Sequence, residues 1–215
     1  MDPALFVRRN TAIAAPPLVP EICLHLATEV TPIWQATEES LTRSGLPPPF
    51  WAFVWVGGQA LARYLLDHPE QVAGRSVLDF GAGSGLVAIA AAKAGAACVL
   101  AVEIDHFAAA AIAANSELNG VEVAVTTADF IDSAGPHWEV ITAGDVCYER
   151  PMAGRVTGWL RTRARCGSLV LLGDPGRAYL PAEGLCERAS YLVPTSRDLE
   201  DRETRAAVVW EVLPS

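Results

Sequence analysis

The sequence predicts an α/β protein built on a doubly wound, mainly parallel sheet, and three observations indicate this fold. Short apolar segments alternate with helical ones from residue 76 onward. A glycine-rich loop directly follows the first of these apolar segments. Hydrophobic residues make up 51% of the 215-residue chain, which is enough for a sizeable core in one ordinary domain. Ligands of such folds bind at the carboxyl ends of the strands.

Seven strands are expected, and most of them alternate with helices. The strand-like segments cover residues 77–80, 97–102, 121–125, 138–143, 168–172, 188–193 and 205–212. Helices are expected over residues 59–67, 86–94, 106–118 and 151–164. Gly95 and Gly120 end the second and third of these helices, and Asp105 caps the third. The last two strands have no helix between them, so we expect an antiparallel hairpin.

The N-terminal 48 residues are expected to form a helical extension to a main domain that covers residues 49–215. Residues 1–17 are mixed in character and should be irregular. Pro20 and Glu21 then open an apolar-periodic stretch, which predicts a helix that Pro32 ends or kinks.

The negative charge of the chain is concentrated in its middle third. The chain has 25 acidic and 16 basic residues, a net charge of −9. Residues 76–145 hold nine acids and a single base, Lys93, which gives −8, against −2 for residues 1–75 and +1 for residues 146–215. Nucleic acid is therefore not expected as a partner, since binding phosphates needs the opposite balance. The middle third instead suits a cationic ligand.

We expect a cytoplasmic monomer without a membrane segment or a metal. No apolar run reaches the roughly 18 residues of a membrane helix, and the N-terminus shows no secretory signal. The five cysteines are an odd number with no CxxC pair, which is typical of reduced thiols and gives no zinc signature.

The strongest local motif is the glycine loop that runs from Gly81 to Gly85, shortly after Asp79. Glycine lets the backbone turn tightly and approach a ligand where a side chain would clash. Glu103, 22 residues beyond Gly81, ends the next strand, where a carboxylate can accept both hydroxyl groups of a ribose.

Two cofactor classes compete for this loop. A dinucleotide-binding loop needs its last glycine where Leu86 stands, and its pyrophosphate would lie close to Asp79. S-adenosylmethionine (SAM) carries a sulfonium and an ammonium but no phosphate, so an acidic loop suits it. The sequence therefore favours SAM over NAD, and a purely structural glycine turn is the remaining alternative.

Asp145 and Tyr148 follow the fourth strand, where the chemistry is expected. Val146 and Cys147 break the Asp/Asn-Pro-Pro-Tyr/Phe pattern of nucleic-acid amino-methyltransferases, and Asp-x-x-Tyr resembles instead the motif of a group of protein methyltransferases. A lysine amine, with an ordinary pKa of about 10.4, arrives charged. Asp145 is expected to attract and orient it, while Tyr148 closes the slot. Alternatively, Asp145 caps the next turn and Tyr148 packs in the core.

An aromatic cluster follows a Gly-Leu-Pro-Pro-Pro run at residues 45–49, which marks the boundary between the two parts of the chain. Trp51 and Trp55 either line the mouth of the site or cover the core. Trp55, which shortly precedes a glycine pair, is expected to contact the cofactor, and Trp51 the substrate. Phe50 and Phe53 are assigned to the core.

A Gly-Asp-Pro-Gly-Arg segment, which contains Asp174 and Arg177, follows the fifth strand. Its composition is typical of a simple turn. Both charged side chains are also expected at the mouth of the site, where they can hold a substrate's backbone or an acidic side chain.

These motifs, in this order, resemble the electron transfer flavoprotein β-subunit lysine methyltransferases, in a bacterial form. The resemblance covers roughly residues 18–212 and is carried by Pro49-Phe50-Trp51-Ala52, Trp55 to Asp67, the glycine loop, Glu103-Ile104-Asp105, Asp145 to Tyr148 and Gly173 to Arg177. It implies a Rossmann-like seven-strand methyltransferase sheet and SAM-dependent methylation of lysines on the flavoprotein's β subunit.

The resemblance also assigns roles to particular residues. The cofactor residues carried over are Trp55, Asp79, Gly81, Gly83, Glu103 (the ribose acid) and Asp129 (at the adenine amine), and the catalytic ones are Asp145 and Tyr148. The sequence departs from the family pattern at Glu103, where many relatives have Asp, and at Val56, where Pro is common.

Two other functions remain open. A small-molecule N-methyltransferase would act on an amine or a nicotinamide-like pyridine nitrogen, in a pocket sealed by the N-terminal helix and the aromatic cluster. A SAM-binding regulator without turnover is the second, and the intact pair of Asp145 and Tyr148 counts against it.

Overall fold

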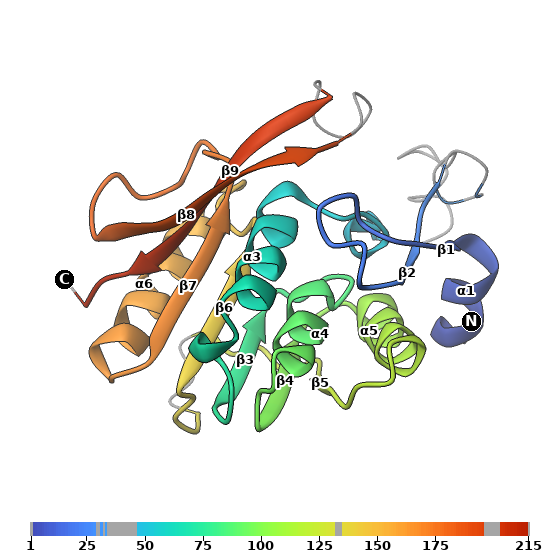
Figure 1. Ribbon diagram of the computed structural model, residues 1–215, viewed down its shortest axis with the longest axis horizontal. Helices are drawn as coiled ribbons and strands as arrows, with labels where there is room; N and C mark the ends of the chain where they lie inside the picture. The colour runs from blue at the N-terminus through green and yellow to red at the C-terminus, as the bar shows by residue number, and fades with distance from the viewer. Residues whose placement is uncertain are drawn as a thin grey trace.

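A seven-stranded sheet forms the centre of the protein (Figure 1). The computed structural model describes residues 2–28, 31, 33, 47–131, 135–195 and 203–214. The strands of the sheet are β3 (Ser76–Phe80), β4 (Cys98–Val102), β5 (Ala124–Thr126), β6 (Val140–Gly144), β7 (Leu169–Asp174), β8 (Leu185–Pro194) and β9 (Thr204–Val212). The strands from β3 to β7 run parallel, and β8 and β9 form an antiparallel hairpin that joins the sheet at β7. The predicted sheet is confirmed.

The order of the strands places a ligand crevice near the middle of the sheet. The strands lie in the order β5-β4-β3-β6-β7-β9-β8, so the winding of the chain reverses beside β3. Ligands of doubly wound sheets bind at such a switch point, beyond the carboxyl ends of the strands. The loops that follow β3, β4 and β6 meet there.

Helices cover both faces of the sheet. The helices α3 (Val56–Asp67), α4 (Leu86–Lys93) and α5 (His106–Leu118) lie on one face, and α6 (Met152–Arg165) lies on the other (Figure 1). Successive strand residues point to opposite layers, so Val77 packs under the first group and Leu78 under α6. None of the helices in the described ranges has the length and apolar character that crossing a membrane requires.

The helix boundaries follow local signals closely in most places. Helix α5 begins at His106 as predicted, and Asp105 caps it by accepting the N–H of Phe107 at 2.8 Å. Helix α3 is an exception, because it begins at Val56, three residues before the predicted start. Two short 3₁₀ turns, η1 (Phe50–Ala52) and η2 (Pro69–Gln71), flank α3.

The first residues of the chain are more regular than the sequence suggests. A helix, α1 (Pro3–Asn10), stands where irregular structure was expected, and Asp2 caps it by accepting the N–H of Ala4 at 3.0 Å. Pro32 lies outside the described residues, and the division of the chain after residue 48 stays a prediction.

The helix predicted after Pro20 is wrong. A short strand, β2 (Leu24–Leu26), takes its place and pairs antiparallel with β1 (Ala12–Ala14). The two leucines of β2 are buried while His25 between them is only half-buried, which is the alternation of a strand. Asn115 of α5 accepts the backbone N–H of His25 at 2.7 Å. This hydrogen bond to a helix far away in the sequence holds the segment in an extended conformation. The local sequence pattern does not indicate the contact.

Candidate active site

A cavity of about 660 Å³ lies at the carboxyl ends of the central strands. Its wall is formed by the loops after β3, β4, β5, β6 and β7, the segment before α3, and the first turns of α5 and α6. Nine of the residues predicted to form the site line this cavity: Trp51, Trp55, Gly81, Gly83, Glu103, Asp129, Asp145, Tyr148 and Arg177. Asp79 and Asp174, which are also described, are not among its lining residues.

The glycine loop brings backbone rather than side chains to the cavity wall. Gly81 and Gly83 have φ angles of 65° and 53°, in the left-handed region that residues with a Cβ rarely adopt. The N–H of Gly83 donates to Oε2 of Glu103 at 3.0 Å. This hydrogen bond ties the loop after β3 to the end of β4 at the edge of the cavity.

Glu103 is a partly buried carboxylate at the end of β4. Its Oε1 accepts the N–H of Asp105 at 3.3 Å, and burial raises its pKa. Each carboxylate oxygen has two lone pairs, so these backbone contacts leave it capacity to accept more hydrogen bonds. A group of this kind at a cavity wall can accept the hydroxyl groups of a ribose.

Asp79 lies behind the glycine loop. Its Oδ2 accepts the N–H of Ala88 in the first turn of α4 at 3.1 Å, and its Oδ1 accepts the hydroxyl of Thr142 at 2.8 Å. Burial raises its pKa to about 7. The carboxylate that the resemblance assigns to the cofactor therefore caps α4 and joins β3 to β6.

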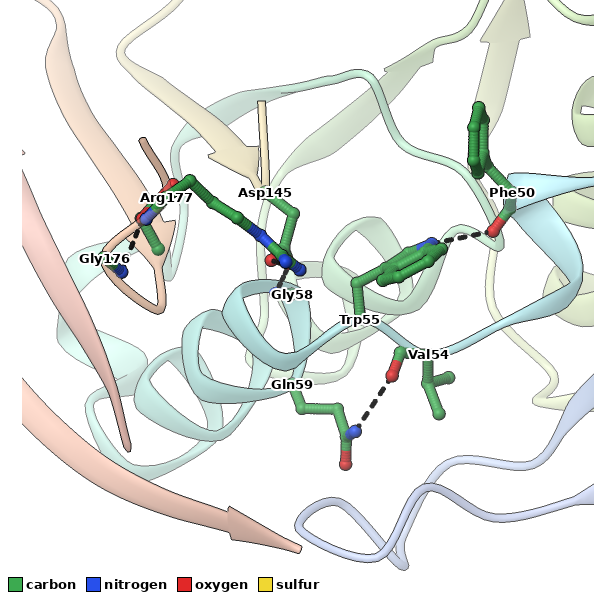
Figure 2. A network of polar contacts seen from close by, with 9 residues as sticks. Phe50, Val54, Trp55, Gly58, Gln59, Asp145, Gly176 and Arg177 are labelled. Carbon is green, nitrogen blue, oxygen red and sulfur yellow. Dashed lines mark hydrogen bonds and ion pairs between the residues drawn. The ribbon is translucent and has the colours of Figure 1, made fainter. Parts of the chain in front are cut away.

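Asp145 follows β6 and lines the cavity, and its side chain lies beside the first turn of α3 (Figure 2). Its Oδ2 accepts the N–H of Gly58 at 2.8 Å, and its Oδ1 lies 3.3 Å from Nη2 of Arg177. Gly58 is in the first turn of α3, whose N-cap residue Trp55 contributes no side-chain cap. Asp145 thus caps α3 from another strand, and the positive end of the helix favours its charged form.

Two glycines allow α3 to approach this closely. A Cβ at Gly57 would lie 2.3 Å from the carbonyl oxygen of Gly173 and 2.8 Å from Oδ2 of Asp145. A Cβ at Gly173 would lie 2.2 Å from the carbonyl oxygen of Gly57. The backbones of α3 and β7 are therefore in direct contact, and this contact brings the start of α3 to Asp145.

The electrostatics of Asp145 are finely balanced. Burial raises its pKa to about 7, Asp174 adds to the rise, and Arg177 and the Gly58 N–H oppose it. Near neutral pH, both the charged and the neutral carboxyl are therefore accessible. A group with this property at a cavity wall can hold a cation and exchange a proton with it.

Aromatic side chains border the same part of the cavity. The indole Nε1 of Trp55 donates to the carbonyl of Phe50 at 2.9 Å (Figure 2). The Phe50 ring lies 6.0 Å from the rings of both Trp55 and Tyr148, centre to centre. Phe50 is 52% exposed and lines the cavity, so its assignment to the core is wrong. Successive side chains of a 3₁₀ turn point in different directions, so the neighbouring Trp51 faces the core in its place.

Trp51 combines both roles that the sequence left open. Its side chain is 2% exposed and packs in a cluster with Val7 of α1 and Ala108 of α5. It also lines the cavity. Phe53, assigned to the core, packs against the same cluster. The aromatic segment therefore joins α1 to the floor of the site.

Asp174 shapes the loop that carries Arg177. Its Oδ1 accepts the N–H groups of Gly176 and Arg177, at 2.7 and 2.6 Å. This is the turn chemistry that the sequence offered as the alternative to a binding role. Within the described residues, Oδ2 of Asp174 is buried without a hydrogen-bond partner. Of the two charged residues predicted here, Arg177 lines the cavity and Asp174 does not.

Apolar residues that sequence reasoning missed form part of the wall. Ile104, which follows Glu103 directly, is 63% exposed and lines the cavity, as do Phe130 and Ile131 beside Asp129. A large apolar residue immediately after a predicted binding carboxylate is a signal that could have revealed Ile104. These side chains offer a surface suited to a flat ring.

The chain is similar to known methyltransferases. A family model described as Ribosomal protein L11 methyltransferase (PrmA) matches residues 59–143. The electron transfer flavoprotein beta subunit lysine methyltransferase of Danio rerio is 40% identical over 212 residues, which cover 95% of this chain and 81% of that protein. The protein of the same name from Homo sapiens is 34% identical over 226 residues, which cover 100% of this chain and 84% of that protein.

The fold is shared with solved structures. The crystal structure of magnesium protoporphyrin IX methyltransferase from Synechocystis PCC 6803 with bound SAM matches with a TM-score of 0.54 at 19% identity, over 73% of this chain and 77% of that one. This likeness shows the fold alone. The two relatives above are similar over nearly the whole chain, and they show that it belongs to the electron transfer flavoprotein beta subunit lysine methyltransferase family.

Proposed function

We propose that this protein is a SAM-dependent protein-lysine N-methyltransferase that acts on the electron transfer flavoprotein β subunit, as the names of its relatives indicate. One observation carries the proposal. Asp145, in the Asp-x-x-Tyr segment, lines the same cavity as Glu103 and the glycine loop. An amine and a nucleoside cofactor can therefore meet in one space.

The cavity residues fit SAM. Glu103 would accept the ribose hydroxyl groups, Asp129 would accept the adenine amine, and the glycine loop lets the backbone approach the cofactor. Among the described lining residues, four carboxylates stand against two guanidinium groups and no lysine. This balance favours a cation and disfavours a pyrophosphate. When bound, SAM supplies an electrophilic methyl group.

Asp145 is suited to receive the substrate's lysine. The lysine arrives as an ammonium ion at neutral pH, and it must lose a proton before its nitrogen is a nucleophile. The Asp145 carboxylate attracts the ammonium and can accept its proton, because burial brings the pKa of Asp145 to about 7. Burial also raises the pKa of Tyr148, so its hydroxyl stays protonated and its ring can face the amine.

The border of the cavity favours a protein substrate over a small molecule. Large apolar side chains that line it are well exposed, and they include Phe50, Tyr148 and Met152. Exposed apolar groups gathered at one place typically mark a surface that another protein covers. The small-molecule alternative has no comparable observation in its favour.

Transfer of labelled methyl groups to the purified flavoprotein tests the proposal. We expect label on lysines of the β subunit, identified by mass spectrometry. Asp145→Asn should lower kcat about 100-fold or more, in the range expected for loss of a positioned acid–base group, because the amide keeps the Gly58 hydrogen bond but loses the charge. Glu149→Gln is the matched control, since Glu149 is an exposed acid of the same loop. Label on a small molecule, with none on lysine, would contradict the proposal.

A further inference from the structure

Arg177 places a permanent positive charge against the carboxylate that the proposed function assigns to the substrate's amine. Its Nη2 lies 3.3 Å from Oδ1 of Asp145. The centre of its guanidinium lies 5.8 Å from the centroid of the Trp55 ring. Figure 2 shows the side chain reaching from the loop after β7 toward both residues. The ion pair thus lies at the cavity wall, where the amine has to arrive.

The protein holds Arg177 at both ends. At the backbone, Oδ1 of Asp174 accepts its N–H at 2.6 Å. At the tip, the guanidinium faces the indole of Trp55, which is itself fixed by its hydrogen bond to the carbonyl of Phe50. The side chain is 19% exposed. A guanidinium held in this way is already in place, so little side-chain entropy is lost when the ion pair forms.

Few groups compensate the burial of Asp145. From α3, the N–H of Gly58 donates to it, and from the loop after β7, Arg177 pairs with it. From the end of β7, Asp174 acts in the opposite direction, as does burial itself. Among these groups, Arg177 supplies the one full positive charge.

Two titratable neighbours of Asp145 on its own loop, Cys147 and Tyr148, add no charge near neutral pH, and the charged Glu149 and Arg150 that follow them are exposed. Burial raises the pKa of the Cys147 thiol to about 12, so the thiol is neutral. Burial also raises the pKa of Tyr148, so its hydroxyl is neutral too. Without Arg177, the hydrogen bond from α3 is the one opposing group left among the described residues named above, against both burial and Asp174.

We propose that Arg177 is a positioning residue: its guanidinium favours the charged form of the Asp145 carboxyl and holds it aimed into the cavity, ready for the substrate's amine. This inference rests on the proposed function for its consequence. Arg177 acts through Asp145 and not on the reacting atoms. The indole of Trp55 contributes to the same positioning, because its contact with the guanidinium fixes the direction in which Arg177 points.

The titration of Asp145 in the free, full-length protein tests the proposal directly. Carbon-13 NMR of aspartate carboxyl groups follows each midpoint with pH, and the signal lost in Asp145→Asn assigns Asp145. We expect the Asp145 midpoint to rise by about one pH unit or more in Arg177→Gln, because an adjacent guanidinium lowers a carboxyl pKa by roughly 1–3 units. Arg177→Lys should stay close to the wild type, since it keeps the charge.

Arg150→Gln is the matched control. Arg150 also lies over an aromatic ring, with its guanidinium 4.9 Å from the centroid of Tyr179, but it is not among the described residues that line the cavity. In Arg150→Gln, the titration midpoint of Asp145 should equal that of the wild type. Arg177→Met, which keeps an apolar stem, serves as a second charge-free variant if Arg177→Gln lowers the melting temperature. An unchanged midpoint in a folded charge-free variant overturns the proposal.

The pH profile of methylation supplies the functional readout. At pH 7, Arg177→Gln should lower kcat about fivefold, because a rise of one unit from a pKa of about 7 takes the charged fraction of Asp145 from about one half to about one tenth. The loss should shrink as the pH rises to 9, which a merely structural defect would not do. A loss that is equal at both pH values overturns the proposal. Absence of methylation on the flavoprotein would contradict the proposed function. The effect of Arg177 on Asp145 would still be tested, because the NMR titration needs no substrate.

Discussion

Asp79 and Asp145 show how one residue type takes two roles near the ends of neighbouring strands. Each lies near the end of a central strand and accepts an N–H from the first turn of a helix, Ala88 in α4 and Gly58 in α3. Burial raises the pKa of each to about 7. The other carboxylate oxygen of Asp79 accepts the buried hydroxyl of Thr142. The other oxygen of Asp145 pairs with the guanidinium of Arg177 at the cavity wall. The sequence predicts both carboxylates as site residues. It does not show that one pairs with a buried hydroxyl and the other with a guanidinium, and this difference in partner gives them different roles.

The buried charge of Asp79 makes stability depend on pH. Its folded pKa of about 7 exceeds the usual unfolded value of about 3.9, so the folded state binds the extra proton between these values. Stability from this group is therefore full at low pH and is lost as the pH rises toward 7 and above.

Asp79→Asn should remove this dependence. The amide keeps the cap on α4 and never ionises. The free energy of unfolding of the variant, minus that of the wild type, should therefore increase as the pH is raised from 5 to 8. The gain should be roughly 1.4 kcal/mol for each pH unit between pH 5 and the folded pKa of about 7, with no further gain above it. Urea unfolding at both pH values measures it, with Glu122→Gln, at an exposed carboxyl, as the control for losing one charge. The same relative stability at both pH values would contradict the prediction.

At the scale of elements, α3 shows why the start of a helix can escape sequence analysis. Glycine is a poor helix former, so the pair at Gly57 and Gly58 predicts a loop. The helix nevertheless begins before both, because Asp145 caps it and the backbone of Gly173 requires a neighbour without a Cβ. Helix α5, whose cap is the adjacent Asp105, begins where the sequence predicts. A helix is predictable when its cap is local and is missed when its cap comes from another strand.

Gly57→Ala should therefore destabilise the protein although alanine favours helices. The new Cβ would meet a backbone oxygen at 2.3 Å and Asp145 at 2.8 Å, and neither can yield without moving a strand or the site. We expect a loss of about 1–3 kcal/mol in the free energy of unfolding, together with reduced methylation. Gly154→Ala in the first turn of α6 is the matched control, because nothing lies within 4 Å of its added Cβ. That variant should gain about 0.5–1 kcal/mol, and equal effects of the two substitutions would refute the argument.

At the scale of the whole molecule, the sheet is predictable and the N-terminal part is not. Seven apolar segments with the spacing of strands and helices are sufficient to predict the order of elements, because burial on both faces repeats along the sequence. The pairing of β1 and β2 depends on Asn115, which is about 90 residues away from His25 in the chain. The concentration of acids in residues 76–145 is likewise visible in the sequence, but the fold alone shows that Glu103, Asp129 and Asp145 line one cavity.

This acidic cavity should distinguish cofactors by their charge. A ligand that binds only the folded state stabilises it by about 2.7 kcal/mol at 100 times its Kd, which for a chain of this size raises the melting temperature by roughly 5–10 °C. We expect SAM to produce such a shift. NADH at the same concentration should produce none, because its pyrophosphate would meet carboxylates with no lysine among the described lining residues. Glu103→Ala should abolish the SAM shift, since it removes the acceptor of the ribose hydroxyl groups, while Glu122→Gln should retain it. A comparable shift with NADH, or a full SAM shift in Glu103→Ala, would show that the charge of the cavity does not select the cofactor.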